Sequence, residues 1–195
     1  MLPPIKSKVH VRNESREFWK EFLASSEVAS LHQAFCQFLS IQTERKKTSR
    51  CLAYHPVRSE FNVLKDLEAS GWDVALPLVG QGFSLTFHLY LEAGEQILNL
   101  EPGAYGLMEP PATAPQMVPR KSDVIIVPTM AVNTEGYRLG KGGGFYDRLM
   151  DHEPYASMEK WAILPEKLLD APFPAEPHDL RLNKIITEER IVTYS

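Results

Sequence analysis

The sequence has few cysteines, and they are not spaced for a disulfide framework or for metal binding. Cys36 and Cys51 are the only two in 195 residues, and no CxxC pair occurs. Disulfide-rich secreted domains and zinc ribbons need more thiols at closer spacing, so both classes are excluded. We predict that each cysteine is a small buried apolar residue and that the protein is cytoplasmic, where thiols stay reduced.

Long apolar runs and a strong net charge are also missing. No run approaches the roughly 20 apolar residues of a membrane-spanning helix, and residues 1–12 lack the apolar core of a signal peptide. A formal net charge of −4 gives no general attraction to nucleic acid or to an anionic membrane. We expect a small-molecule substrate, no nucleic-acid or membrane partner, and a monomer or weak homo-oligomer.

The standard glycine-rich nucleotide motifs are incomplete. Residues 140–145, GKGGGF, miss the last glycine of a dinucleotide-binding fingerprint, and no Gly-Lys-Ser/Thr occurs for a P-loop. This disfavours a dinucleotide-dependent oxidoreductase. The glycines are nevertheless clustered, and the cluster calls for another explanation.

The length suits one domain, residues 1–195, and the order of its patterns indicates an α/β fold. A short strand at residues 51–54, a helix at 61–70 closed by Gly71 and a strand at 72–79 predict a parallel sheet with a crossover. Residues 84–91 alternate polar and apolar, which is typical of a strand with one wet face. Further strands are expected at 124–127 and 161–164, with one or two more in 184–194.

Two amphipathic helices are expected before the first strand, with Asn13 or Ser15 as the cap of the first. The basic residues ahead of this helix, among them Lys8 and Arg12, read locally as a solvated, frayed end. Residues 98–119 are rich in proline and glycine, so they form a loop and a candidate lid or wall of a site.

The segment 123–150 carries the strongest functional signal. A buried strand leads to Gly140, Gly142, Gly143 and Gly144, and a short helix begins near residue 145. Glycines let backbone amides approach an anion, and the start of a helix adds positive partial charge. Two flanking cations and a following carboxylate could bind phosphate and a metal. The alternative is a flexible surface loop with incidental charges.

Ligand sites in open α/β sheets lie beyond the carboxyl ends of the strands. Residues 54–55, residues 128–129 and the segment after residue 164 all follow predicted strands. We therefore expect His55, Glu60, the glycine loop and Asp179 to lie within reach of one cleft.

Residues 136–148, GYRLGKGGGFYDR, closely resemble the signature of the 5-formyltetrahydrofolate cyclo-ligases. Weaker matches extend over nearly the whole chain. They include Val127-Pro128 before the signature, Lys8-x-x-x-Arg12 near the start, Glu60, residues 106–110 (GLMEP) and residues 175–179 (AEPHD).

The resemblance implies a Rossmann-like single domain, with a mostly parallel central sheet, helices on both faces and an antiparallel edge. It implies that Mg²⁺ and ATP are used to close 5-formyltetrahydrofolate into 5,10-methenyltetrahydrofolate, through a phosphorylated formyl (imidate) intermediate, with release of ADP and phosphate. Two alternatives stay open: a divergent paralogue that phosphorylates another amide-like oxygen, and a folate- or nucleotide-binding protein without turnover.

The resemblance also assigns residues. Arg138 and Lys141 would be catalytic, and Asp147 and Asp179 would hold Mg²⁺. Glu60 would accept hydrogen bonds from the pterin's amino and ring N–H groups, because a carboxylate offers two acceptors. The ATP-binding residues would be Lys8, Arg12, Arg138, Leu139, Gly140, Lys141, Gly142, Gly143, Gly144, Phe145 and Tyr146. The substrate-binding residues would be His55, Glu60, Tyr105, Lys141, Gly142, Gly143, Gly144 and Phe145.

The same residues also have ordinary structural interpretations. Asp147 and Glu60 are typical acids of a first helical turn, Asp179 is a turn residue, and His55 and Tyr105 fit strand-end and loop-packing roles. The chain departs from the family pattern at several points. Asn62 replaces an acid, Asn133 an aspartate and Thr129 a glycine; Lys167 is the nearest candidate for a glutamine expected after the strand at 161–164.

Overall fold

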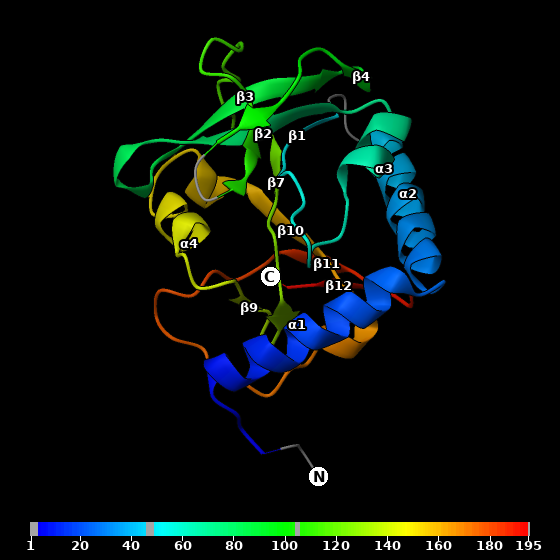
Figure 1. The fold of residues 1–195 in the computed structure, drawn as a ribbon. Coiled ribbons are helices and arrows are strands. Elements are labelled where there is room, and N and C mark those ends of the chain that lie inside the picture. Colours follow the sequence, from blue (N-terminus) through cyan, green and yellow to red (C-terminus); the bar gives the residue numbers. More distant parts are fainter. Residues whose placement is uncertain (1–3, 46–48, 104–105, 195) are drawn as a thin grey trace.

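A twisted sheet forms the centre of the protein (Figure 1). The computed structural model describes residues 4–45, 49–103 and 106–194. In this part of the chain an eight-stranded sheet has the order β12-β11-β10-β7-β1-β2-β3-β4. Its strands are β1 (Arg50–Leu52), β2 (Asp73–Val79), β3 (Leu85–Glu92), β4 (Glu95–Gln96), β7 (Val124–Ile126), β10 (Glu159–Ile163), β11 (Lys184–Ile186) and β12 (Ile191–Thr193).

The middle of the sheet is parallel, as predicted. Strands β11, β10, β7, β1 and β2 run parallel to one another. The predicted antiparallel pairing at the edge is also present, with β12 at one edge of the sheet and β3 with β4 at the other. The strand β7 is buried along its whole length, as its unbroken Val-Ile-Ile sequence requires in a sheet covered on both faces.

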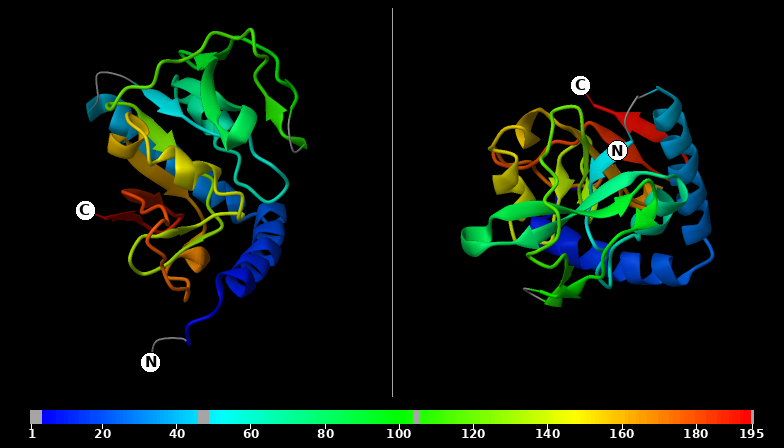
Figure 2. Two further views of the ribbon diagram at one scale, coloured as in Figure 1. Left: turned by 90° about the vertical axis from the view of Figure 1, so that its left-hand side faces the viewer. Right: turned by 90° about the horizontal axis from the view of Figure 1, so that it is seen from above.

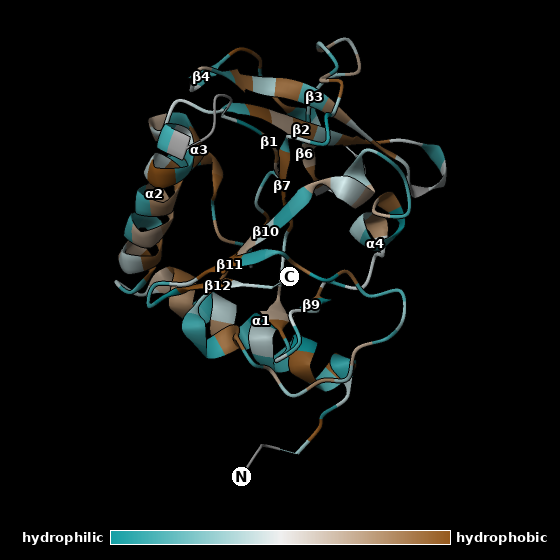
Figure 3. Cartoon of the chain, turned by 180° about the vertical axis from the view of Figure 1, so that it is seen from behind, coloured by the Kyte–Doolittle hydropathy of each residue, from teal (hydrophilic) through white to brown (hydrophobic). Residues whose placement is uncertain are grey.

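Helices cover the two faces of the sheet. The helices are α1 (Lys8–Ala24), α2 (Val28–Arg45), α3 (Leu64–Ala69) and α4 (Phe145–Leu149). Figures 1 and 3 both place α2 and α3 on one side of the sheet and α4 on the other. The apolar stripe of α2, from Leu31 through Phe35 to Leu39, is buried in the core. None of the helices in the described residues has the length and apolarity needed to cross a bilayer.

The start of the first helix differs from the sequence prediction. Helix α1 begins at Lys8, and the hydroxyl of Ser7 caps it by accepting a hydrogen bond from the amide of His10. Neither Asn13 nor Ser15 is a cap, because both lie inside the helix. Lys8 and Arg12 lie within the first two turns of α1, so the prediction of a frayed end is wrong for them.

Two small hairpins lie in segments expected to be loops. They are β5 (Glu101–Pro102) with β6 (Met108–Glu109), and β8 (Ala131–Val132) with β9 (Arg138–Leu139). Asn133 closes the second hairpin, since its side-chain oxygen accepts hydrogen bonds from the amides of Glu135 and Tyr137. Figure 2 shows the tip of a third hairpin, between β2 and β3, extending beyond the rest of the molecule.

Candidate active site

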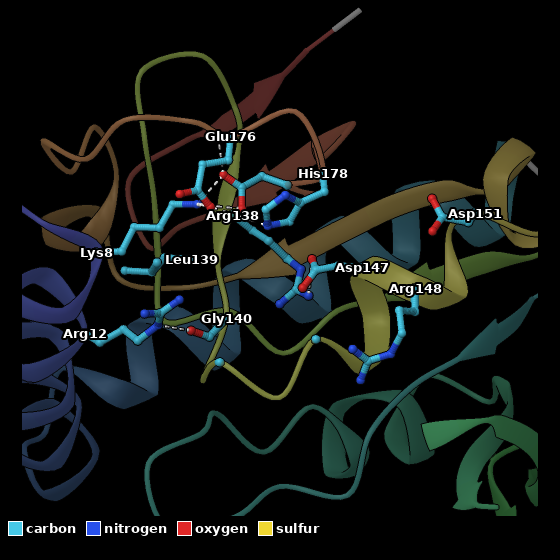
Figure 4. Close-up of a pocket in the computed structure, with 13 residues that line it drawn as sticks. Lys8, Arg12, Arg138, Leu139, Gly140, Asp147, Arg148, Asp151, Glu176 and His178 are labelled. Atoms are coloured by element: carbon cyan, nitrogen blue, oxygen red, sulfur yellow. Dashed lines mark hydrogen bonds and ion pairs between the residues drawn. The ribbon is translucent and has the colours of Figure 1, made fainter. Parts of the chain in front are cut away.

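Two adjacent cavities share part of the glycine loop, residues 140–144. A polar cavity of about 330 Å³ lies between this loop, the start of α1 and residues 176–179 (Figure 4). An apolar cavity of about 400 Å³ lies between the loop, the ends of β1 and β2 and the β5–β6 hairpin. The residues that line both are Arg138, Gly140, Gly142, Gly144 and Asp147.

The amides of the glycine loop are available to a ligand. In the described part of the chain, none of the amides of residues 140–144 donates a backbone hydrogen bond. Gly142 and Gly144 have φ angles of 100° and 67°, in the left-handed region that favours glycine. Backbone amides that stay unpaired along such a loop form a concave donor surface for an anion.

Three arginines pack directly on this loop. Arg12 donates from Nε to the carbonyl of Gly140 at 2.8 Å, and Arg148 donates to the carbonyl of Gly143 at 2.8 Å. A side chain on Gly140 would overlap the guanidinium of Arg138, and a Cβ on Gly144 would lie 2.8 Å from Nη1 of Arg148. The glycines are therefore needed for the guanidiniums to come this close, and the loop gains positive charge beside its amides.

Each acidic residue of the polar cavity that was assigned to metal binding is paired with a cation. Lys8 donates to Asp179 at 2.6 Å and to Glu176 at 2.7 Å, which joins α1 to the loop before β11. Arg138 donates to Asp147 at 2.8 Å and to the carbonyl of Pro128 at 3.3 Å. Figure 4 shows Lys8 beside Glu176 and Arg138 beside Asp147 at the cavity.

Burial and charge act in opposite directions on the pKa values of these cations. Burial opposes the charge of Lys8, but its hydrogen bonds to Asp179 and Glu176 outweigh it, so its pKa lies above the usual 10.5. Burial lowers the pKa of Arg138 below its usual value, although Asp147 and Tyr146 oppose this. Both groups stay positively charged at neutral pH, as phosphate binding requires.

The apolar cavity is lined mainly by apolar side chains, with a few polar groups among them. Lys141 and Glu60, which both line it, form an ion pair of 2.8 Å, and the other oxygen of Glu60 accepts from the amide of Val57 at 3.0 Å. Burial lowers the pKa of His55, with Glu60 opposing the shift, so the imidazole is neutral at pH 7. The apolar wall consists of Tyr54, Val57, Pro77, Val79, Leu85, Leu107, Met108, Pro128, Phe145 and Tyr146.

The comparisons with known proteins agree on one family. The model of the 5-formyltetrahydrofolate cyclo-ligase family matches residues 5–188. The chain belongs to this family. A 5-formyltetrahydrofolate cyclo-ligase of Mycolicibacterium smegmatis is 36% identical over 143 residues, which cover 71% of this chain and 73% of the relative. The same-named protein of Escherichia coli K12 is 27% identical, with 75% and 88% covered.

Solved structures show the same fold. A 5,10-methenyltetrahydrofolate synthetase of Aquifex aeolicus aligns with a TM-score of 0.72 and 25% identity, covering 95% of this chain and 92% of that one. A synthetase of Mycoplasma pneumoniae aligns with a TM-score of 0.69 at 21% identity, covering 94% and 99% of the two chains. As a member of the cyclo-ligase family, the protein is an enzyme of the ligase class.

The structure distributes the residues assigned from the family signature over both cavities. Lys8, Arg12, Leu139 and Asp179 line the polar cavity, and His55 and Glu60 line the apolar one. Gly140, Gly142 and Gly144 of the glycine loop line both. Lys141, Gly143, Phe145 and Tyr146 also line the apolar cavity. Tyr105 lies outside the described residues.

The departures from the cyclo-ligase pattern have local roles. The side chain of Asn62 is exposed and accepts from the amide of Leu64 at the start of α3, and Thr129 donates to the carbonyl of Val127. Lys167 lines neither cavity. The sequence pattern overlooked Glu176, which shares Lys8 with Asp179, and it gave no role to Glu109, which lines the apolar cavity.

Proposed function

We propose that the protein uses Mg-ATP to close 5-formyltetrahydrofolate into 5,10-methenyltetrahydrofolate, with release of ADP and phosphate. Family membership supports the cyclo-ligase activity. The observation that supports the role of ATP is the glycine loop, whose unpaired amides lie among the guanidiniums of Arg12, Arg138 and Arg148. Amides and guanidiniums together are the usual donors to phosphate oxygens.

The triphosphate would lie along the glycine loop, with its charged end in the polar cavity. Arg138 and Lys141 would contact the transferred phosphoryl group, and Lys8 and Arg12 would contact neighbouring phosphate oxygens. The buried Nε of Arg138 has no hydrogen-bond partner among the described residues, which supports its role as a further donor. Leu139, Phe145 and Tyr146 would line the nucleotide at the two ends of the loop.

The residues present fit a magnesium ion. The carboxylates of Asp147 and Asp179 line the same cavity, and Mg²⁺ prefers such oxygen ligands. When bound, the ion would neutralise part of the phosphate charge. Each carboxylate is now paired with a cation proposed to bind phosphate. Binding of Mg-ATP would therefore exchange these two ion pairs for contacts between the carboxylates and Mg²⁺ and between the cations and phosphate.

The folate would enter the apolar cavity, which is large enough for a bicyclic ring. Phe145 and the aliphatic walls would hold the ring, and His55 would contact it as a neutral imidazole. Glu60 would accept hydrogen bonds from the pterin, which requires Lys141 to leave Glu60. Lys141 belongs to the loop shared by both cavities, so it is then placed to turn towards phosphate.

The reaction needs positioning and charge more than a side-chain nucleophile. The formyl oxygen attacks the γ-phosphorus and ADP leaves, which gives the phosphorylated imidate. N10 then adds to the formyl carbon and loses its proton, and the C–O bond breaks as phosphate departs. Alignment and charge stabilisation provide most of the catalysis in phosphoryl transfer. Burial raises the pKa of Tyr146, so this nearby phenol stays protonated and is no base.

The test is to mix the purified protein with 5-formyltetrahydrofolate and Mg-ATP, and to follow the methenyl chromophore together with ADP. The proposal predicts equal amounts of both products. ADP without the chromophore would indicate a different substrate. Tight binding of folate and ATP with neither product would indicate a binding protein.

A further inference from the structure

Glu109 is a buried carboxylate that the proposed reaction does not use. It lies at the end of β6, in the wall of the apolar cavity. The residue is 5% exposed, and its Oε1 has no hydrogen-bond partner among the residues that the structure describes. A carboxyl oxygen that is removed from water without a partner destabilises the folded protein, so such groups in native proteins call for an explanation.

The other described acids of this cavity are already engaged. Glu60 uses one oxygen for Lys141 and the other for the amide of Val57. Asp147 accepts from Arg138. Among the described carboxylates of the cavity wall, Glu109 is the one with a buried oxygen that has no donor.

The local backbone holds the Glu109 carboxylate in place. Strand β6 pairs with β5, and Glu109 is in register with the exposed Glu101. The carboxylate packs on Gly103 so closely that a Cβ on that glycine would overlap it. The walls beside it are apolar, including Leu107 and Met108, and water competes weakly for a hydrogen bond in such surroundings.

We propose that Glu109 is a second substrate-binding carboxylate, which accepts hydrogen bonds from N–H donors on the edge of a flat nitrogen heterocycle in the apolar cavity. The identity of the heterocycle rests on the proposed function: the donors are then the 2-amino group and ring N–H of the pterin. Glu109 and Glu60 both accept hydrogen bonds from this edge of the ring, and Glu109 can do so before Lys141 moves away from Glu60.

The experiment measures binding of 5-formyltetrahydrofolate by calorimetry without ATP. Glu109→Gln is expected to bind about tenfold more weakly or worse, because hydrogen bonds to a charged group are strong and an acceptor becomes a donor. The matched control is Glu101→Gln, the same change on the paired strand, with affinity within about twofold of wild type because its exposed side chain is solvated. Glu109→Gln should also keep or raise Tm, because a neutral amide is easier to bury than a carboxylate.

Two further measurements separate binding from structure. Gly103→Ala keeps the carboxylate but displaces it, and it should also weaken folate binding. A 5-formyl folate analogue with methyl in place of the 2-amino group should bind wild type more weakly than the natural folate, and this difference should shrink in Glu109→Gln.

Unchanged folate affinity in Glu109→Gln, in a protein that forms the methenyl product, overturns the role of Glu109 and leaves the proposed function standing. Folate binding that depends on Glu109 in a protein that forms no product supports this inference and contradicts the proposed function. If the wild-type protein does not bind 5-formyltetrahydrofolate at all, the role of Glu109 and the proposed function are both refuted.

Discussion

Arg138 is the residue whose removal should affect both cavities at once. It is 5% exposed, lines both cavities and donates to Asp147 and to the carbonyl of Pro128. We expect Arg138→Ala to lower turnover at saturating substrates by about 10³-fold, the scale seen when an arginine that stabilises phosphoryl transfer is removed. This corresponds to roughly 4 kcal/mol of lost transition-state stabilisation.

The same substitution should have a smaller effect on stability. It breaks two hydrogen bonds, but the side chain of Asp147 is 27% exposed and can be solvated again. A loss of about 2 kcal/mol is therefore reasonable, below the value for a fully buried pair. In a domain of this size that lowers Tm by about 4–8 °C, so the variant stays folded at 25 °C.

The assay is the initial rate of methenyl formation, measured beside the Tm of each variant. Arg138→Lys should recover only part of the rate, because one ammonium cannot reproduce the guanidinium fork. Arg181→Ala is the control: this exposed arginine donates to the carbonyl of Glu135, away from both cavities, and its loss should leave turnover within about twofold. A rate for Arg138→Ala within tenfold of wild type would refute the catalytic role.

Three further outcomes follow from the site. Glu60→Gln should weaken folate binding about tenfold without weakening ATP binding, since an acceptor is lost only on the folate side. Calorimetry with each ligand checks this, and equal losses of affinity for folate and ATP would point to misfolding. Gly144 and Gly82 have φ angles of 67° and 66°, so replacing either with alanine should lower stability by about 1 kcal/mol. Only Gly144→Ala should also weaken ATP binding, and equal ATP affinities of the two variants would contradict the role of the glycine loop. The pKa of His55 is lower in the folded than in the unfolded protein, so its contribution to stability is present above about pH 6.5 and is lost as pH falls. The Tm of His55→Gln should therefore depend less on pH between about pH 6.5 and 5. An unchanged dependence of Tm on pH would exclude His55 as its cause.

The parallel middle of the sheet was predictable because its signals are local. The strands near Cys51 and Trp72 flank one amphipathic helix, and Gly71, with φ of 69°, ends it as expected. The segment before the glycine loop is three apolar β-branched residues, which suit a strand buried on both faces. Such patterns depend on neighbours a few positions apart, so spacing alone reveals them.

The ion pairs of the site could not be predicted from spacing. Lys8 and Asp179 are 171 positions apart, and each looks ordinary in its own segment. Local patterns also misplaced the start of α1. The residues before Phe18 are mostly polar, and without knowledge of their tertiary contacts they resemble an unstructured terminal segment. The family signature assigned roles to both Glu60 and Lys141, but it did not predict that the two side chains pair with each other.

The central claim is that ATP activates the formyl oxygen in the site around the glycine loop. The most direct test uses 5-formyltetrahydrofolate labelled with ¹⁸O in the formyl group, together with unlabelled Mg-ATP and water. The proposed reaction predicts that the released phosphate carries the label, because the formyl oxygen bonds to the γ-phosphorus and leaves with it. Methenyl product formed with unlabelled phosphate would contradict the phosphorylated intermediate and the role given to the glycine loop.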